Sequence, residues 1–306
     1  MTSSDPVDEL LLPRMQTGSN PQHLIVTMLG DYWSGRSEHV PSAGLVAITS
    51  EFGISSTSAR AALGRLARRG LLDVTKDGRR TFYGLTARAE QVLDEGFRRI
   101  ATFGRHDSPW GGSWVVVVFS VPEGQRDVRH ILRTRLRWLG FAPLYDGAWV
   151  SPRAEPKEAA ALLHELGVAT ATVFVADVAH ALPGGDPLAA WDLDELRTSY
   201  EEFMSRHQSL LERSRRGQVG AAEALVARTQ VMDEWRQFPN LDPELPDVAL
   251  PRRWPRRAAR AVFAEIYDLL GPLALARFQE LLSEHAPELA PRAHFLATGS
   301  VAGADA

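Results

Sequence analysis

The chain has 306 residues, of which 44% are hydrophobic, and a formal net charge of −4 at pH 7. This length predicts two or three globular domains, and the mild acidity excludes a protein that coats nucleic acid over its whole surface. The absence of cysteine excludes disulfides, thiolate zinc sites and a cysteine nucleophile. We find no signal peptide and no apolar run of the roughly 18 residues that a membrane span requires, so we expect a cytoplasmic protein without a membrane partner.

The N-terminal part predicts an arm followed by two helices. Residues 1–19 are polar and acidic apart from three leucines, and we expect a flexible arm. Asn20 and Pro21 are a natural N-cap and first residue for a helix. A second helix is expected from Ser42, as its cap, to Gly53, which would form a tight turn to the next helix.

A third helix is predicted between Ser55 or Ser56, as its cap, and Gly70, as its stop. Its apolar residues recur at the spacing of one buried helical stripe: Ala59, Ala62, Leu63 and Leu66. The opposite face carries small or hydroxyl residues near the start and long cations toward the end. This distribution suits a recognition helix whose first turns approach DNA base edges while its flanks contact phosphates.

The residues after this helix predict a β-hairpin. Asp77-Gly78 lies between two apolar runs and is a strong turn signal. Residues 55–81 contain seven cations and two acids, a local net charge of +5 in an acidic chain. An ordinary solvated helix face is the usual meaning of such charges, but helix, basic hairpin and charge imbalance coincide here.

The sequence therefore predicts a winged helix-turn-helix that binds double-stranded operator DNA. The residues expected to contact DNA are Ser55, Ser56, Thr57, Arg60, Arg65, Arg68, Lys76, Arg79 and Arg80.

The middle of the chain predicts a ferredoxin-like domain. Thr86 can cap a helix that leads away from the DNA-binding part, and a composition break at 106–112 marks a boundary. The following residues alternate as strand (114–119), helix (125–139), strands (141–144 and 148–150), helix (156–166) and strand (170–178). The order β-α-β-β-α-β is that of a ferredoxin-like sandwich.

The C-terminal part predicts helices at 193–211, 221–235, 256–270 and 272–283, and its prolines argue against a helix over 238–246. The predicted fold class is thus multidomain α+β. The expected domains are an arm (1–19), a winged helix with linker helix (20–105), a ferredoxin-like domain that could dimerise (106–185), a helical domain that could sense an effector (186–298) and a tail (299–306).

Two arginine clusters leave alternatives open. Arg126, Arg129, Arg133 and Arg137 share one face of the 125–139 helix, which is either solvated or a phosphate contact. A second cluster around Trp254 consists of Arg252, Arg253, Arg256, Arg257 and Arg260. Its members either pair with acids such as Asp242, Glu244 and Asp247 or bind a nucleotide phosphate. Trp191, Trp235 and Trp254 are expected to pack in the core rather than to form a cage around a ligand, because aromatic residues at helix ends usually pack. The histidines show no metal-site spacing, and we expect neither a metal nor a cofactor.

Five blocks of sequence carry a resemblance to a known family. They are Gly30-Asp31-Tyr32, the run 58–70, the segment 78–86, the run 191–196 that opens a helix, and Glu234-Trp235-Arg236-Gln237-Phe238-Pro239-Asn240-Leu241-Asp242-Pro243-Glu244-Leu245-Pro246. The last block is the most specific. From about Asn20 onward the chain resembles the PaaX family, repressors of bacterial phenylacetate-degradation operons.

The resemblance implies a homodimeric repressor that an aromatic acyl-CoA, such as phenylacetyl-CoA, releases from its operator. The residues considered for effector binding are Arg133, Trp191, Trp235, Arg236, Arg252 and Trp254.

Two other functions compete with that of a repressor. The middle domain also resembles the small CRISPR-associated nuclease fold, in which an aspartate ends the first strand and helps bind a metal. Ser120 stands at that position here, and a hydroxyl cannot replace a carboxylate as a firm Mg²⁺ ligand, so we do not expect an enzyme. A protein-interaction scaffold without an effector is the third reading, which ligand-induced thermal stabilisation would test.

Overall fold

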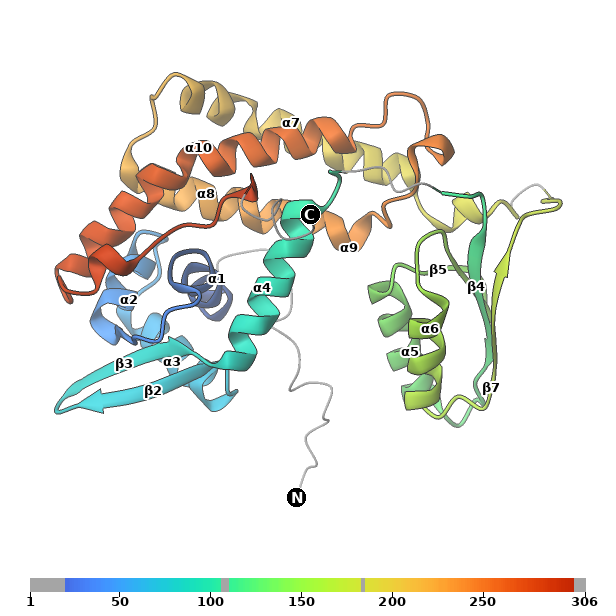
Figure 1. The fold of residues 1–306 in the computed structure, drawn as a ribbon, viewed down its shortest axis with the longest axis horizontal. Helices are drawn as coiled ribbons and strands as arrows, with labels where there is room; N and C mark the ends of the chain where they lie inside the picture. Colours follow the sequence, from blue (N-terminus) through green and yellow to red (C-terminus); the bar gives the residue numbers. More distant parts are fainter. Residues whose placement is uncertain (1–19, 106–109, 183–184, 300–306) are drawn as a thin grey trace. The chain divides into compact units, whose positions relative to one another are not determined.

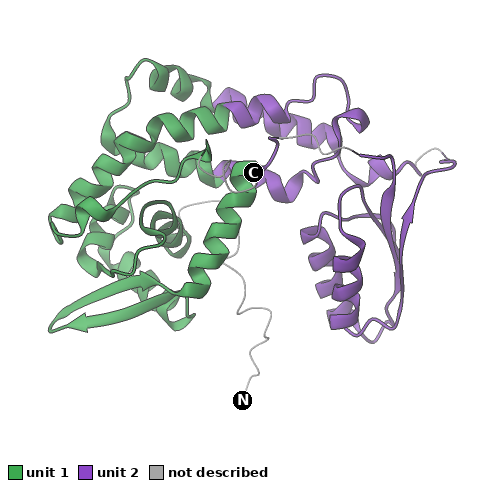
Figure 2. Ribbon diagram, viewed as in Figure 1, with its two compact units in different colours: residues 1–102, 207–233, 262–306 green, residues 103–206, 234–261 purple. Residues whose placement is uncertain are grey.

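The computed structural model describes residues 20–105, 110–182 and 185–299. The expected arm (1–19) and most of the expected tail (300–306) lie outside these ranges. The chain forms two compact units (Figure 2). Unit 1 takes its described residues from 20–102, 207–233 and 262–299, and unit 2 takes them from 103–206 and 234–261.

Unit 1 begins with helices and a small antiparallel sheet (Figure 1). Its first elements are α1 (Pro21–Trp33), β1 (Val40–Pro41), α2 (Ser42–Ser50), α3 (Ser56–Arg68), β2 (Leu72–Asp77), β3 (Arg80–Leu85) and α4 (Ala87–Thr102). The predicted cap of α1 is confirmed, because the side chain of Asn20 accepts a hydrogen bond from the backbone N–H of Gln22. The cap of α4 is confirmed in the same way, since Thr86 accepts from the N–H of Ala89.

The short strand β1 was not predicted, and it changes how α2 begins. The sheet order is β1-β3-β2, with Val40 opposite Tyr83 and Pro41 opposite Phe82. The chain stays extended through Pro41, which therefore occupies the N-cap position and provides no side-chain hydrogen bond. The prediction that Ser42 caps α2 is wrong, because Ser42 is already the first helical residue. Gly53, with a φ of 74°, does form the predicted turn.

Parts of three later helices complete unit 1: residues 207–215 of α7 (Leu193–Arg215), 221–233 of α8 (Ala221–Trp235) and 262–283 of α10 (Arg256–Ser283). The rings of Tyr32 and Phe278 stack with centroids 4.8 Å apart, which joins α1 to α10. Gly44 of α2 lies so close to Leu282 that a Cβ atom there would stand 2.9 Å from its side chain. The absence of a side chain at Gly44 therefore permits α2 to pack against α10.

The predicted break between two helices at Pro272 is wrong, because α10 continues through it. Proline removes one helical hydrogen bond, but the residues on either side of it are held by packing. Leu270 and Ala274 are buried, and the ring of Phe295 lies against Gly271. Tertiary contacts thus outweigh the local cost of the proline.

Unit 2 contains a four-stranded antiparallel sheet covered on one face by two helices. In chain order the elements are β4 (Trp114–Ser120), α5 (Arg126–Trp138), β5 (Ala142–Tyr145), β6 (Ala148–Ser151), α6 (Pro156–Glu165) and β7 (Thr170–Ala176). The sheet order β5-β6-β4-β7 fits the predicted ferredoxin-like fold. Val117, Phe119 and Leu136 belong to the core between sheet and helices.

The remainder of unit 2 is mostly helical. It includes η1 (Pro187–Ala190), the first part of α7 (Leu193–Arg215), α9 (Phe238–Leu241) and η2 (Asp247–Ala249), while η3 (Ala290–Arg292) lies in unit 1. The prediction of no helix over 238–246 is wrong for its first four residues. Pro239 occupies the first turn of α9, where a missing N–H costs nothing. None of the helices described is long and apolar enough to span a membrane.

Candidate nucleic-acid interface

Helix α3 presents two chemically distinct faces. Ala59, Ala62, Leu63 and Leu66 are buried, as their spacing predicted. Ser55 is the N-cap, and its hydroxyl accepts a hydrogen bond from the N–H of Ser58 at 3.2 Å. The helix is followed by Gly70 with a φ of 68°, a backbone conformation that suits glycine. The buried stripe fixes which side of α3 faces outward.

The hairpin formed by β2 and β3 carries the second set of charges. The two strands pair from Leu72 opposite Leu85 to Asp77 opposite Arg80. Gly78, with a φ of 56°, lies in the turn as the Asp-Gly signal predicted. The guanidinium of Arg80 donates to the carbonyl of His285 at 3.2 Å, so one hairpin cation is also held by the protein itself.

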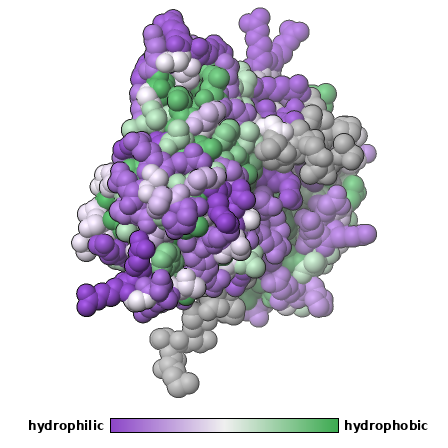
Figure 3. Space-filling model, turned by 60° about the vertical axis from the view of Figure 1, so that its left-hand side comes forward, coloured by the Kyte–Doolittle hydropathy of each residue, from purple (hydrophilic) through white to green (hydrophobic). Residues whose placement is uncertain are grey.

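All nine residues predicted to contact DNA lie in unit 1, and every one is exposed. They occupy the N-terminal end and outer face of α3 and the β2–β3 hairpin. Unit 1 is drawn on the left in Figure 1, and Figure 3 turns that side of the molecule forward. Most of the surface seen there is hydrophilic. The arrangement combines hydroxyls at a helix N-terminus with flexible cations on either side, which is chemistry suited to a phosphate backbone and base edges.

A salt bridge from α10 holds the turn that precedes α3. Arg277 donates to both carboxylate oxygens of Glu51, at 2.7 and 3.3 Å. Glu51 is the residue directly after α2, and Glu38, before β1, pairs with Arg292. Bidentate pairing fixes the geometry of both partners. The turn between α2 and α3 is therefore held in place by α10.

Arg228 is fully buried beneath this region and joins three elements of unit 1. Its guanidinium donates to Asp31 at 3.3 Å, to the hydroxyl of Tyr32 at 3.0 Å and to the carbonyl of Tyr267 at 3.1 Å. It also lies 3.6 Å from the centre of the Tyr267 ring. Burial raises the pKa of Asp31, and the positive charge of Arg228 opposes that shift. Burial likewise raises the pKa of Tyr32 to about 12.

Two charged residues within apolar stretches of the sequence are a signal of this network that the spacing of apolar residues does not capture. Asp31 stands on a helix whose neighbouring positions are apolar, and Arg228 interrupts an apolar stretch of α8. A lone charge in such surroundings is rarely buried without a partner. Each of these charges therefore predicts a buried partner of opposite charge, and in the structure each is the partner of the other, although 197 residues separate them.

The residues considered for effector binding all lie in unit 2 but in different surroundings. Trp235 is fully buried, with the Phe103 ring edge-on at 5.7 Å. Trp254 lies edge-on to Tyr200, and Trp191 stacks on Trp114 at 6.0 Å. The other three are cations: Arg252 is exposed, Arg236 is half-buried, and Arg133 donates to the carbonyl of Asp146 at 3.4 Å.

The predicted pairing of the second arginine cluster with acids is confirmed in two cases. Arg256 makes a buried bidentate contact with Asp242, at 2.7 and 2.9 Å, while Arg257 pairs with Asp247 at 2.8 Å. The hydroxyl of Tyr200 also donates to Asp242, at 2.7 Å. Asp242 thus explains part of the specific block 234–246, because it is the anchor that holds this segment to α7 and α10.

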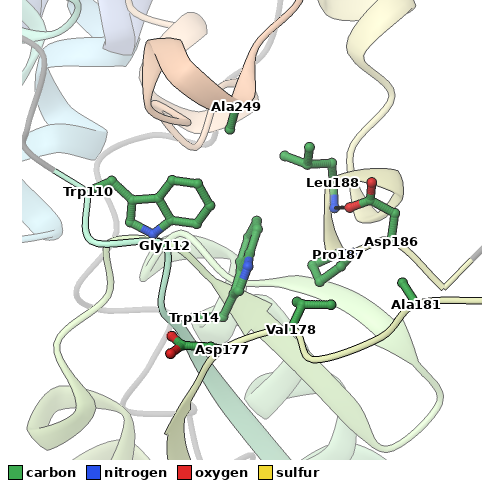
Figure 4. A pocket seen from close by; sticks show the side chains of 10 residues that line it. All are labelled: Trp110, Gly112, Trp114, Asp177, Val178, Ala181, Asp186, Pro187, Leu188 and Ala249. Carbon is green, nitrogen blue, oxygen red and sulfur yellow. Dashed lines mark hydrogen bonds between the residues drawn. The ribbon is translucent and has the colours of Figure 1, made fainter.

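A cavity of about 460 Å³ opens in unit 2 beside the end of β7 (Figure 4). The indoles of Trp110 and Trp114 form one wall, edge to face with centroids 5.2 Å apart. Pro187 and Leu188 lie opposite them, and the carboxylates of Asp177 and Asp186 are the charged groups of the lining. The cavity suits a flat apolar group more than an anion. Among the residues predicted to bind the effector, Trp191 contacts the wall of this cavity, because its ring stacks on that of Trp114.

Ser120 lies at the end of β4, opposite Thr170 of β7. Among the described residues, no group of three or more His, Asp and Glu side chains is arranged to hold a metal ion.

Comparison with known proteins assigns the chain to a family. The model described as PaaX-like protein matches residues 20–89, that of the PaaX protein central Cas2-like domain matches 107–186, and that of the PaaX-like protein C-terminal domain matches 191–280. The transcriptional repressor PaaX of Escherichia coli (strain K12) is 29% identical over 266 residues, which cover 84% of this chain and 82% of that protein.

A solved structure shares the fold. The uncharacterized protein Rv0674 from Mycobacterium tuberculosis superposes with a TM-score of 0.58 at 19% identity, covering 86% of this chain and 98% of that one. The three models all carry PaaX in their descriptions and follow one another along the chain, and the Escherichia coli relative is a transcriptional repressor. This chain belongs to the PaaX family.

Proposed function

We propose that this protein is a transcriptional repressor that binds operator DNA through a winged helix-turn-helix in residues 20–105. In this arrangement α2 and α3 are the two helices of the motif and the β2–β3 hairpin is the wing. The observation that carries the proposal is the exposure of all nine predicted contact residues on one helix and one hairpin with a local charge of +5. The relationship to a known repressor supports it.

The proposed reading mode follows from the position of each residue. Thr57 and Arg60, near the start of α3, would approach base edges in a major groove, and Arg65 and Arg68 would contact phosphates. Arg79 and Arg80 of the wing would reach phosphate or the adjoining minor groove. A homodimer, with residues 106–185 as its dimerisation domain, would place two such units on a palindromic operator.

The proposed effector is an aromatic acyl-CoA such as phenylacetyl-CoA, sensed by residues 186–298 together with the cavity of unit 2. The indole wall of Trp110 and Trp114 would accept the aromatic ring. Asp177 and Asp186 would repel phosphates, so the nucleotide end of the thioester would lie outside the cavity. Release requires that the effector bind the DNA-free state more tightly than the bound state.

The experiment that tests this function is fluorescence anisotropy with the protein's own upstream DNA and a scrambled duplex, with and without phenylacetyl-CoA. Specific binding that the thioester releases would support both repressor and effector. Specific binding that ignores the thioester would retain the repressor and reject this effector. Equal affinity for both duplexes would contradict the proposed function.

A further inference from the structure

One side of α5 carries a line of arginines. Arg126, Arg129, Arg133 and Arg137 follow one another at spacings of three or four residues, so they share one side of the helix, and we call these four residues the arginine flank. The whole helix contains five arginines and one aspartate, a net charge of +4 with its histidine neutral. It covers one face of the sheet together with α6 (Figure 1). Positive charge in unit 2 is therefore concentrated along a single helix.

Two members of the arginine flank are held by backbone carbonyls. The guanidinium of Arg129 donates to the carbonyl oxygen of Val121 at 2.6 Å, and that of Arg133 donates to the carbonyl oxygen of Asp146 at 3.4 Å. A guanidinium has five N–H donors, and each of these contacts uses one of them. The two side chains are thus positioned by neutral groups and keep donors for a further acceptor.

The two ends of the arginine flank are exposed. The guanidinium of Arg137 lies 5.3 Å from the centre of the Trp149 ring, a cation–π contact that positions the charge without cancelling it. Arg126 is the first residue of α5. Within the described ranges, no carboxylate forms an ion pair with any member of the flank. All four charges therefore remain without a counter-charge from these parts of the chain.

Other arginines of unit 2 show that this is not the rule. Arg135, on the opposite flank of the same helix, pairs with Glu165 of α6. Arg206 pairs with Glu234 at 2.8 Å. An ordinary solvated surface mixes both signs of charge in this way. The arginine flank is instead similar to the arginines within α3, which also form no ion pair among the described residues.

The geometry of the flank suits a linear array of phosphates. From Arg126 to Arg137 the helix rises about 16 Å, with one charge roughly every 4 to 6 Å. A compact nucleotide would contact only some of these side chains, and none of the four lines the cavity of unit 2. A polymer with phosphates at regular intervals can contact them all. Arginine also matches phosphate oxygens in geometry, because its planar fork donates two parallel hydrogen bonds.

We propose that the arginine flank of α5 is a second DNA-binding surface, which contacts the sugar-phosphate backbone of the duplex and reads no bases. The proposal rests on the proposed repressor function, because operator DNA is the polyanion that unit 1 would bind. The contact adds affinity and salt dependence on any duplex and leaves the choice of sequence to α3.

The first test replaces the two exposed ends of the flank together, Arg126→Gln with Arg137→Gln. Its matched control, Arg135→Gln with Lys157→Gln, removes two cations of the same unit that lie outside the flank. Anisotropy titrations at several salt concentrations use both native and scrambled duplexes, and thermal unfolding checks the fold. The flank variant should reduce the slope of log affinity against log salt concentration by about 1 to 2 on both duplexes, while the control keeps the wild-type slope.

The second test locates the DNA directly and uses the absence of cysteine. His130 is exposed on α5 beside the arginine flank, so a photocrosslinker attached to His130→Cys should link to the duplex. The same label on Lys157→Cys, an exposed position of α6, should not link. This comparison separates a contact at α5 from a general effect of net charge.

Free coenzyme A tests the other source of phosphate, a nucleotide. If coenzyme A raises the melting temperature of the wild type but not of the flank variant, and the flank variant binds DNA like the wild type, the flank belongs to a nucleotide and the proposal is overturned. A slope that the flank variant leaves unchanged would overturn it as well, and so would an equal change in the control.

Sequence preference separates this proposal from the proposed function. A wild type that prefers the native duplex, with a flank variant that binds it just as tightly and with the same salt dependence, would reject only the α5 surface. A wild type that binds both duplexes equally, with a flank variant that binds both more weakly, would reject only the repressor.

Discussion

Arg60 tests whether α3 reads sequence or only contacts phosphate. It is exposed on the face of α3 opposite the buried stripe, one turn from the capped N-terminus. Arginine donors matched to a base edge contribute about 1–3 kcal/mol of discrimination. We therefore expect Arg60→Ala to weaken binding to the native site about tenfold or more and binding to scrambled DNA much less. Equal losses on both duplexes in anisotropy titrations would make Arg60 a phosphate contact only.

Arg228 should be among the residues whose loss most destabilises unit 1. Replacing it with methionine leaves the Asp31 carboxylate buried without its cation, which typically costs about 3–5 kcal/mol in free energy of unfolding. Urea unfolding should show a large drop in the midpoint of the transition. The matched control is Arg213→Met, which removes a solvent-exposed ion pair with Glu223 and should leave the midpoint of the transition nearly unchanged.

The double variant Arg228→Met with Asp31→Leu distinguishes charge from packing. If the buried charge is the cause, removing both charges should recover much of the lost stability. If the double variant is as unstable as Arg228→Met alone, the hydrogen bonds of Arg228 to the carbonyls of Tyr267 and Leu296 carry the effect instead.

At the scale of the element, Gly64 is a glycine in the middle of α3 that the packing of the chain does not require. Glycine inside a helix costs about 1 kcal/mol relative to alanine. A Cβ atom at Gly64 would meet nothing within 4 Å, so packing within the chain does not require glycine there. A close approach of DNA to the helix backbone would require it. Gly96 of α4 is likewise surrounded by open space, and nothing in the structure explains it.

We expect Gly64→Ala and Gly96→Ala to stabilise the fold similarly, by roughly 0.5–1 kcal/mol. Only Gly64→Ala should weaken DNA binding, because only its methyl group would lie between α3 and the duplex. Thermal unfolding and anisotropy on the same samples provide the comparison. Unchanged DNA affinity in Gly64→Ala would show that the duplex does not contact α3 at this point.

Local sequence signals predicted most elements but failed where tertiary contacts decide. The caps at Asn20 and Ser55 were visible because a cap depends on residues within one turn. Ser42 is not a cap because Val40 and Pro41 pair with β3, whose residues lie more than 40 positions further along the chain. Pro272 was read as a break because the packing that holds α10 straight through it comes from Phe295 and other distant residues.

The same limit applies to the candidate site. The outer face of α3 could be predicted because exposure follows from the buried stripe opposite it. The ion pairs that hold the elements around α3 could not be predicted, since their arginines, Arg277, Arg228 and Arg292, come from the C-terminal half of the chain. Spacing along a sequence does not show which distant helix will carry such a partner.

For the whole molecule, positive charge is concentrated in residues 55–81, whereas the rest of the chain is acidic on balance. The chain has a net charge of −4 and residues 55–81 carry +5, which leaves −9 for the remainder. Because the remainder is acidic on balance, the α3 and hairpin cations should supply most of the non-specific attraction to DNA, with the arginines of α5 as a second local excess of positive charge.

The salt dependence of binding measures this division. Each cation that neutralises a phosphate contributes about 0.9 to the slope of log affinity against log salt concentration. Arg79→Ala with Arg80→Ala should therefore reduce the magnitude of the slope by roughly 1 to 2, with the lower value if the contact of Arg80 with His285 persists on DNA. The control is Arg98→Ala, which removes an exposed cation of α4 outside residues 55–81. A slope that changes as much in Arg98→Ala as in the hairpin variant would show that DNA contacts extend beyond residues 55–81.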